Sequence, residues 1–126
     1  MSERLRGVVG QLAVRPSDRV LEIGCGQGVA ATMVCQVLST GTLTAIDRSV
    51  KMVEAATRRN APYVASGKAE FLIASLEDMS LGDRRFDLVF AVRVALFHRE
   101  PERARALLEP WLAPGARVMT FYDVPV

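Results

Sequence analysis

The sequence predicts an α/β fold in which helices cover both faces of a doubly wound, mostly parallel sheet of about five strands. Along the chain, segments whose apolar residues follow the helical period alternate with short apolar runs that are typical of buried strands. Strands that alternate with helices at this spacing imply right-handed β-α-β crossovers. With 126 residues, 50% of them hydrophobic, and a net charge of +2, the chain can bury one core and has no room for a second. We therefore expect a single domain over residues 1–126.

Helices and strands alternate through the first half of the chain. The predicted helices cover residues 5–14 and 29–38 and begin again at 50, and the predicted strands cover 19–23 and 43–46. Pro16 ends the first helix and Gly41 stops the second. Ser49 is the predicted N-cap of the third helix, which ends before Pro62 and has an inner face of Val50, Val53 and Ala56.

The second half continues the alternation. The predicted strands cover residues 70–74, 86–91 and 118–122. The middle one is continuously apolar, which is typical of a strand buried on both faces, so we place it centrally in the sheet. Pro101 suits the first turn of a helix, Pro110 kinks or restarts it, and Pro114-Gly115 turns the chain into the last strand. The inner stripe of this helix is Ala104, Leu107, Leu108, Trp111 and Leu112.

Ligands of such sheets bind outside the carboxyl ends of the strands. The segments there are Gly24–Gly28, Asp47-Arg48, Ser75–Asp78, Ala91–His98 and Tyr122-Asp123. The glycines let the backbone turn tightly after the first strand and approach a ligand closely. The loop fits either a dinucleotide, whose fingerprint matches from Gly26 to Ala31, or a nucleoside that carries an amino-acid tail.

Two carboxylates lie at this end of the sheet, and one of them, Glu22, helps to choose between these ligands. Glu22, which we expect to point at the same crevice as the glycines, would repel a pyrophosphate but would attract the ammonium group of an amino-acid tail. Its other possible role is to cap the amides of its own loop. Asp47 ends the second strand and can hold ribose hydroxyls in either ligand, or can help to cap the next helix.

Four motifs carry a family resemblance over residues 18–123: Val20–Gly28, Ala45–Ser49, Phe86–Phe90 and Leu112–Gly115. In this order they resemble the class I S-adenosylmethionine-dependent methyltransferases. The resemblance implies a Rossmann-like sheet, S-adenosyl-L-methionine as cofactor and in-line transfer of a methyl group to an acceptor. The cofactor-binding residues that it implies are Glu22, Gly24, Cys25, Gly26, Gly28, Asp47, Arg48, Ser75, Leu76, Ala91 and Arg93.

The resemblance also implies a role for each of these positions. Glu22 would sense the methionine ammonium, the glycine loop would pack against the tail and ribose, and Asp47 would hold the ribose diol. Arg48 would lie along one face of the adenine, and the Leu76 amide would donate to its edge. Three residues would border the transferable methyl group: Ala91, Val92 and Arg93.

The chain departs from its relatives at the adenine edge and offers no clear catalytic residue. Many relatives carry an acid where this chain has Ser75, so the contact to the exocyclic amine is weakened or passes to Glu77 or Asp78. A base is needed only if the acceptor arrives protonated. His98, the one histidine, is the candidate base, and a surface or capping role suits it equally well.

The sequence argues against some classes of methyl acceptor but does not identify the acceptor. No Asn-Pro-Pro-Tyr-like run follows the fourth strand, which argues against methylation of adenine or glutamine amino groups. Arg93 would oppose a catalytic cation, so we expect no metal; it binds an acidic substrate, faces solvent or pairs with Glu22 or Asp123. The scattered charges indicate no nucleic-acid partner. We expect an unidentified, small-molecule acceptor.

The end of the sequence predicts a partner. Relatives carry an antiparallel hairpin beside the fifth strand, whereas this sequence stops at Val126, which would leave an apolar edge that a second copy or a partner chain covers. A homodimer is therefore expected. A non-catalytic S-adenosylmethionine-binding subunit or sensor, completed by a partner chain, is the alternative function, and a nicotinamide enzyme is the third.

The longest apolar run is Leu88–Val92, far short of the roughly 20 residues that a membrane span needs. No secretory signal is apparent at the N-terminus. The sequence therefore predicts a cytoplasmic protein without a membrane segment.

Overall fold

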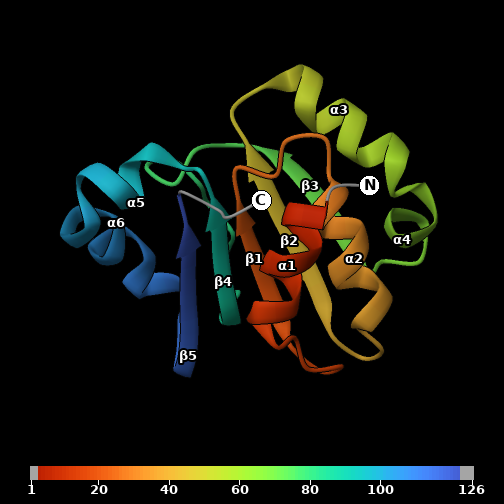
Figure 1. Ribbon diagram of the computed structural model, residues 1–126, viewed down its shortest axis with the longest axis horizontal. Helices are drawn as coiled ribbons and strands as arrows, with labels where there is room; N and C mark the ends of the chain where they lie inside the picture. The colour runs from red at the N-terminus through yellow and green to blue at the C-terminus, as the bar shows by residue number, and fades with distance from the viewer. Residues whose placement is uncertain (1–2, 123–126) are drawn as a thin grey trace.

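The fold is a five-stranded, all-parallel sheet with helices on both faces (Figure 1). The computed structural model describes residues 3–122. The strand order is β3-β2-β1-β4-β5, so the strand next to the glycine loop lies in the middle of the sheet. The strands are β1 (Arg19–Ile23), β2 (Thr42–Asp47), β3 (Ala69–Ile73), β4 (Phe86–Val92) and β5 (Leu112–Phe121). The predicted doubly wound α/β fold is confirmed.

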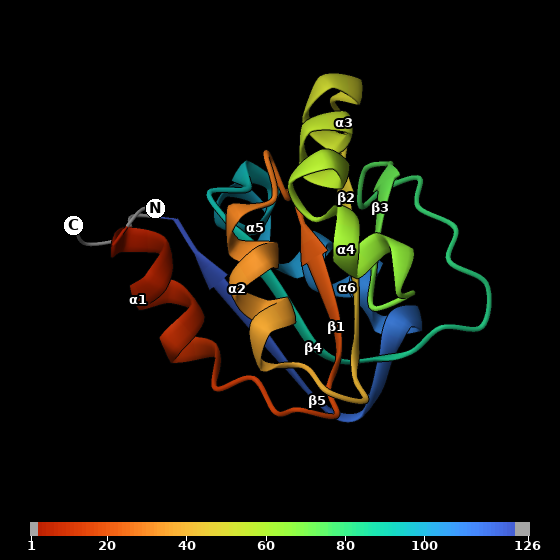
Figure 2. The same cartoon turned by 90° about the vertical axis from the view of Figure 1, so that its right-hand side faces the viewer.

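The helices divide between the two faces of the sheet (Figure 2). One face carries α1 (Glu3–Leu12), α2 (Val29–Val37), α3 (Val50–Arg59) and α4 (Ala61–Ala65). The other carries α5 (Ala95–Arg99), α6 (Pro101–Leu108) and the 3₁₀ turn η1 (Glu109–Trp111). No helix within residues 3–122 has the length and apolar character that a membrane crossing needs.

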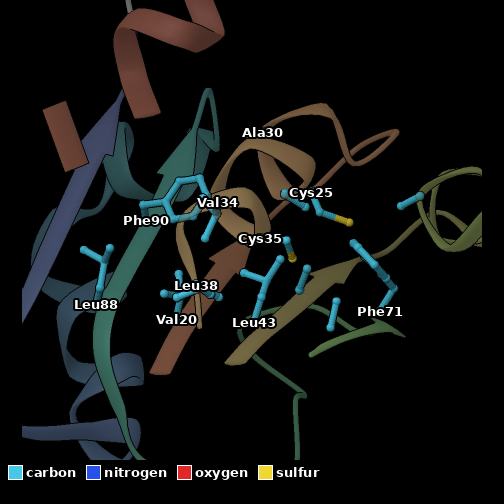
Figure 3. Close-up of a cluster of buried hydrophobic side chains, with 14 of the residues drawn as sticks. Val20, Cys25, Ala30, Val34, Cys35, Leu38, Leu43, Phe71, Leu88 and Phe90 are labelled. Carbon is cyan, nitrogen blue, oxygen red and sulfur yellow. The ribbon is translucent and has the colours of Figure 1, made fainter. Parts of the chain in front are cut away.

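The alternation of side chains along each strand builds a separate core on each face. Val20, Leu43 and Phe90 pack against α2 residues such as Val34 and Leu38 (Figure 3). On the opposite face, the strand residues Leu21, Ile23 and Val89 pack against Ala104 and Leu108 of α6. The sheet is therefore buried on both faces, as its apolar strands indicate.

Most predicted boundaries hold, and the differences have local causes. Ser49 caps α3, accepting a hydrogen bond from the Met52 amide at 3.2 Å. Val53 and Ala56 form the inner face of this helix as expected, but Val50 is 52% exposed because it lies in the first turn, beyond the sheet. Helix α2 ends at Val37 with extended Leu38 as its C-cap, so Gly41 does not stop it.

The last strand is longer than predicted. Leu112, expected on the helix, opens β5, and Pro114-Gly115 lies inside the strand as a bulge where the register with β4 shifts. The bulge takes up the three extra residues of β5 without ending the strand. The Pro-Gly pair in the sequence suggests a turn instead. Strand β4 is an interior strand, but β1 and not β4 is central. The short helices α4 and α5 are absent from the prediction because five residues show little periodicity.

A buried asparagine joins the end of α3 to the start of α2. Asn60, fully buried, donates from Nδ2 to the carbonyl of Gly28 at 3.1 Å and to that of Ala56 at 3.0 Å. Its Oδ1 accepts from the Thr32 hydroxyl at 2.7 Å. The amide therefore satisfies backbone and side-chain groups of two helices at once, and holds the last residue of the glycine loop.

Replacing Asn60 by alanine should lower the free energy of unfolding by about 2–3 kcal/mol, because the carbonyls of Gly28 and Ala56 each lose a donor and the Thr32 hydroxyl loses one of its two acceptors in a fully buried network. Urea denaturation measures the change. The matched control is T57A, since the Thr57 hydroxyl bonds only to Val53 of its own helix; this variant should stay within about 0.5 kcal/mol of the original protein. Equal effects of the two substitutions would contradict the structural role of Asn60.

Candidate functional site

A cavity of about 500 Å³ lies at the carboxyl ends of the strands. One wall is formed by the end of β1 with Gly24 after it, and by the end of β2, Ile46 and Asp47. The connection after β4 forms the opposite wall. This is where ligands of doubly wound sheets bind. Six of the residues predicted from the sequence line the cavity together: Gly24, Asp47, Arg48, Ser75, Leu76 and Arg93.

The glycine loop is held against the end of β2. The amides of Gly24 and Cys25 donate to the Ile46 carbonyl at 2.8 and 2.9 Å. Asp47 accepts from the Gly26 amide through Oδ2 and from the Ser49 amide through Oδ1, both at 2.9 Å. A carboxylate has about four acceptor sites, so each oxygen of Asp47 keeps capacity for a further donor. Asp47 thus both shapes the loop and remains able to bind hydroxyl groups.

The last glycine of the loop is fixed by packing as well as by its backbone. Gly28 is the N-cap of α2 with φ of +81°, a conformation that glycine tolerates best. A Cβ atom there would lie 2.8 Å from Nδ2 of Asn60 and 2.9 Å from Cβ of Ala56. Sequence reasoning missed Asn60, although it is the chain's one asparagine and stands directly after a predicted helix.

Glu22 is a buried carboxyl with an unsatisfied oxygen. It is 3% exposed, and its Oε1 has no hydrogen-bond partner within the described part of the chain. Burial raises the pKa of this carboxyl well above its usual value, and the negative charge of Asp47 raises it further. Such an oxygen is costly unless a donor or a cation meets it.

Glu22 lies close enough to the glycine loop and to Asp47 to interact electrostatically with both, but it is not among the residues that line the large cavity. Neighbouring residues of a strand face opposite sides, so Ile23 takes the cavity side and Glu22 shares the α2 side with Val20. Its charge accordingly acts on Cys35, a residue of α2. Glu22 therefore lies outside the walls of the large cavity, as do Cys25, Gly26 and Gly28.

The two cysteines are buried, free and weakly acidic (Figure 3). Burial raises the pKa of the Cys25 thiol to about 12, with contributions from Glu22 and Asp47. Burial also raises the pKa of Cys35, to about 11. Both side chains behave as small apolar groups of the core, since a thiol without thiolate character is a poor nucleophile.

The segment after β3 forms a compact turn on the cavity wall. Asp78 accepts from the Ser75 amide at 2.7 Å, and the Ser75 hydroxyl accepts in return from the Asp78 amide at 3.3 Å. The turn leaves the Leu76 amide without an acceptor in residues 3–122. Glu77 lines the cavity whereas Asp78 does not, so of the two acids considered for the missing adenine contact, Glu77 is in place.

Arginines border the cavity on the β4 side. Arg93 directly follows β4 and has an unusual φ of +59°, and its amide donates to the Phe121 carbonyl. It is exposed and forms no ion pair with Glu22; the proposed alternative partner, Asp123, lies outside the described residues. Arg103 also lines the cavity and is 3.5 Å from Glu100 and 3.9 Å from Glu77.

A second cavity of about 150 Å³ adjoins the first. Ala91, expected beside the transferable methyl group, lines this smaller cavity and not the larger one. His98 lines it too, and its ring stacks on Tyr122 with 4.2 Å between centroids. Val94 lines both cavities. Two cavities that share Val94 therefore lie at the carboxyl ends of the strands.

Known proteins share this sequence pattern. A family model described as a methyltransferase domain matches residues 20–115. The chain is 26% identical over 120 residues to the O-methyltransferase cnsE of Penicillium expansum, covering 94% of this chain and 43% of that protein. It is 31% identical over 85 residues to the putative methyltransferase YrhH of Bacillus subtilis, covering 68% and 46%. The chain thus spans less than half the length of these relatives.

Solved structures share the fold. Geranyl diphosphate methyltransferase in complex with S-adenosylmethionine superposes with a TM-score of 0.78 at 17% identity, over 93% of this chain and 47% of that one. A methyltransferase from Thiobacillus denitrificans, in complex with S-adenosyl-L-homocysteine, gives 0.76 at 23% identity, over 94% and 48%. Because the methyltransferase model covers most of the chain, the resemblance seen in the sequence is confirmed, and the chain belongs to the class I S-adenosylmethionine-dependent methyltransferase family.

Proposed function

We propose that this chain binds S-adenosyl-L-methionine at the carboxyl ends of β1, β2 and β4 and forms the cofactor-binding part of a methyltransferase for a small-molecule acceptor. The observation that carries the proposal is the cavity of about 500 Å³ that is lined by Gly24, the first residue of the glycine loop, and by Asp47, which accepts a hydrogen bond from the Gly26 amide. Its size suits a nucleoside ligand, since ligand pockets commonly measure about 300–1,000 Å³.

Each wall of this site offers a group suited to one part of the cofactor. Asp47 would accept hydrogen bonds from the ribose diol through the capacity that its two amide contacts leave free. The unused Leu76 amide would donate to the adenine edge, and Arg48 would lie on the adenine face. These assignments rest on the positions of the residues and on the family pattern.

The surroundings of Glu22 in the ligand-free protein do not satisfy its carboxyl group, and a bound cation would. Its Oε1 has no donor, and its raised pKa disfavours the ionised form that a buried carboxylate takes only beside a positive charge. An ammonium group would supply that charge. Glu22 therefore supports a ligand with an amino-acid tail, and gives no support to a pyrophosphate.

The bound cofactor supplies a sulfonium-activated methyl group, which leaves in an in-line displacement. The protein need only hold the acceptor in line with it, and such positioning contributes about 7–11 kcal/mol to catalysis. Arg93 and the residues after it border the cavity on the side where an acceptor would enter. A cofactor-binding subunit or sensor without its own acceptor is the competing proposal.

Calorimetric titration with S-adenosylhomocysteine tests the proposal, with NADH as the control ligand. We expect micromolar binding of S-adenosylhomocysteine alone. Binding of NADH in its place would refute the assignment and favour a nicotinamide enzyme. Tight binding of S-adenosylhomocysteine without methylation of any acceptor would favour the sensor.

Replacing Asp47 by asparagine should weaken S-adenosylhomocysteine binding by about 1–3 kcal/mol, the range for a lost hydrogen bond to a charged group. The same titration measures it. D83N is the matched control, because Asp83 is exposed near the amino ends of the strands and should leave the affinity unchanged. Unchanged affinity in both variants would remove Asp47 from the site.

Glu22→Gln should stabilise the ligand-free protein and weaken ligand binding. The raised pKa means that the folded protein holds a proton that the unfolded chain releases, so Glu22 lowers stability as the pH rises above about 4.5, its unfolded value. Glutamine removes this penalty. We expect the free energy of unfolding to rise by about 1–3 kcal/mol at pH 7 and to change little near pH 4.

Two further measurements complete this test. Thermal unfolding at both pH values should show no comparable effect for E54Q, since Glu54 is exposed on α3. In calorimetry, S-adenosylhomocysteine should bind E22Q more weakly, whereas methylthioadenosine, which lacks the amino-acid tail, should bind both proteins alike. A variant that loses stability at pH 7 would show that Glu22 is satisfied without a ligand.

The outer edge of β5 supports a proposal about assembly. Within residues 3–122 β5 pairs only with β4, and an open strand edge is usually covered in soluble proteins (Figure 1). We propose that a second copy or a partner chain covers this edge, and that the protein acts in the cytoplasm. Light scattering should report a mass above that of one chain; a monomer that binds no hydrophobic dye would contradict the assembly.

A further inference from the structure

Helix α3 holds the glycine loop from both of its ends. At the start of the helix, the Asp47 carboxylate joins the amide of the N-cap residue to an amide of the loop. At the end of the helix, Nε of Arg59 donates to the carbonyl of Gln27 at 3.1 Å. The next residue, Asn60, donates from Nδ2 to the carbonyl of Gly28, also at 3.1 Å. The last two residues of the loop are therefore bound by their carbonyls to the end of α3.

Three donors converge on the Gly28 carbonyl. Besides Nδ2 of Asn60, they are the amide of Thr32 at 3.1 Å and its hydroxyl at 3.0 Å. The same hydroxyl is 2.7 Å from Oδ1 of Asn60, so the two side chains form one network around this oxygen. Because a peptide group is planar and trans, a fixed Gly28 carbonyl also fixes the direction of the Val29 amide. The network therefore holds the peptide group at which the loop becomes α2.

A short series of hydrogen bonds connects this peptide group with the large cavity. The Gly28 amide donates to the Cys25 carbonyl at 3.1 Å and closes a turn that contains Gly26. The Gly26 amide in turn donates to Asp47, which lines the cavity. A displaced Gly28 would therefore loosen the turn and, through it, the contact that orients the Asp47 carboxylate.

Asn60 acts on this series from outside the cavity. Its side chain is fully buried and is not among the residues that line the cavity, so a ligand there would not touch it. It also packs closely against the loop, since a Cβ atom at Gly28 would lie 2.8 Å from its Nδ2. Any influence of Asn60 on a ligand must therefore pass through the shape of the loop.

We propose that Asn60, together with the Thr32 hydroxyl, is a positioning residue of the cofactor site: it sets the shape of the glycine loop, and the affinity for S-adenosylmethionine depends on it although it touches no ligand. The part of this inference that concerns affinity rests on the proposed function. The inference goes beyond a contribution to overall stability, because it requires a local change at the loop when the network is broken.

Hydrogen exchange tests the local change without a ligand. Selective ¹⁵N labelling of glycine gives one backbone amide signal for each of the nine glycines. In N60A the amides of Gly26 and Gly28 should exchange at least about tenfold faster relative to the amide of Gly41. Gly41 precedes β2 at the other end of the sheet, and its amide is also hydrogen-bonded. The ratio therefore separates opening of the loop from unfolding of the whole chain.

Calorimetry with S-adenosylhomocysteine tests the effect on affinity, at a temperature where every variant is folded. N60A should bind at least about fivefold more weakly, the lower end of the range for coupling between separate sites. V8A is the control: Val8 is fully buried on α1, so its truncation lowers overall stability, but it should change neither the affinity nor the exchange ratio. T32V, which loses the hydroxyl at equal size, should weaken binding, whereas T32S, which keeps it, should bind as the original protein does.

Several results would overturn the positioning role: an unchanged exchange ratio in N60A, the same change in V8A as in N60A, undiminished affinity of N60A, or equal affinities of T32V and T32S. Failure of the cofactor proposal looks different. In that case the original protein itself binds no S-adenosylhomocysteine, and the exchange ratio alone decides whether Asn60 shapes the loop.

Discussion

The carboxylate of Asp47 is the contact on which the geometry of the site depends. It bridges the Gly26 amide and the Ser49 amide, and so joins the loop after β1 to the start of α3. The Ile46 carbonyl before it holds the two preceding amides of the loop. Because these bonds use the loop's backbone donors internally, the loop is pre-shaped before a ligand arrives. Preorganisation of this kind reduces the ordering cost of binding.

Glu22 represents the opposite case, a group whose burial costs stability. The ligand-free protein leaves Oε1 without a donor, and the pKa of the carboxyl rises because charge is unfavourable there. A neutral residue of similar size would pack at this position with less cost. An unfavourable buried group next to a well-ordered loop is typical of functional sites, where the cost is recovered when the ligand binds.

The fold could be predicted because its signals are repeated along the chain: buried β1 and β4, a capped α3 and the glycine loop each indicate the same parallel architecture. The features that escaped prediction depend on tertiary contacts. Asn60 shows no local pattern, and only the folded chain brings Gly28 to its amide. The partnerless Oε1 of Glu22 likewise becomes apparent only when the folded chain surrounds the carboxyl group.

The division of the carboxyl edge into two cavities has its origin in the glycine loop itself. Val94 stands between the cavities, and its Cγ2 would lie 2.8 Å from a Cβ atom at Gly24. A side chain at position 24 would therefore push Val94 away and merge or distort the two spaces. Gly24 thus lines the wall of the proposed cofactor site and lets Val94 come close to that wall.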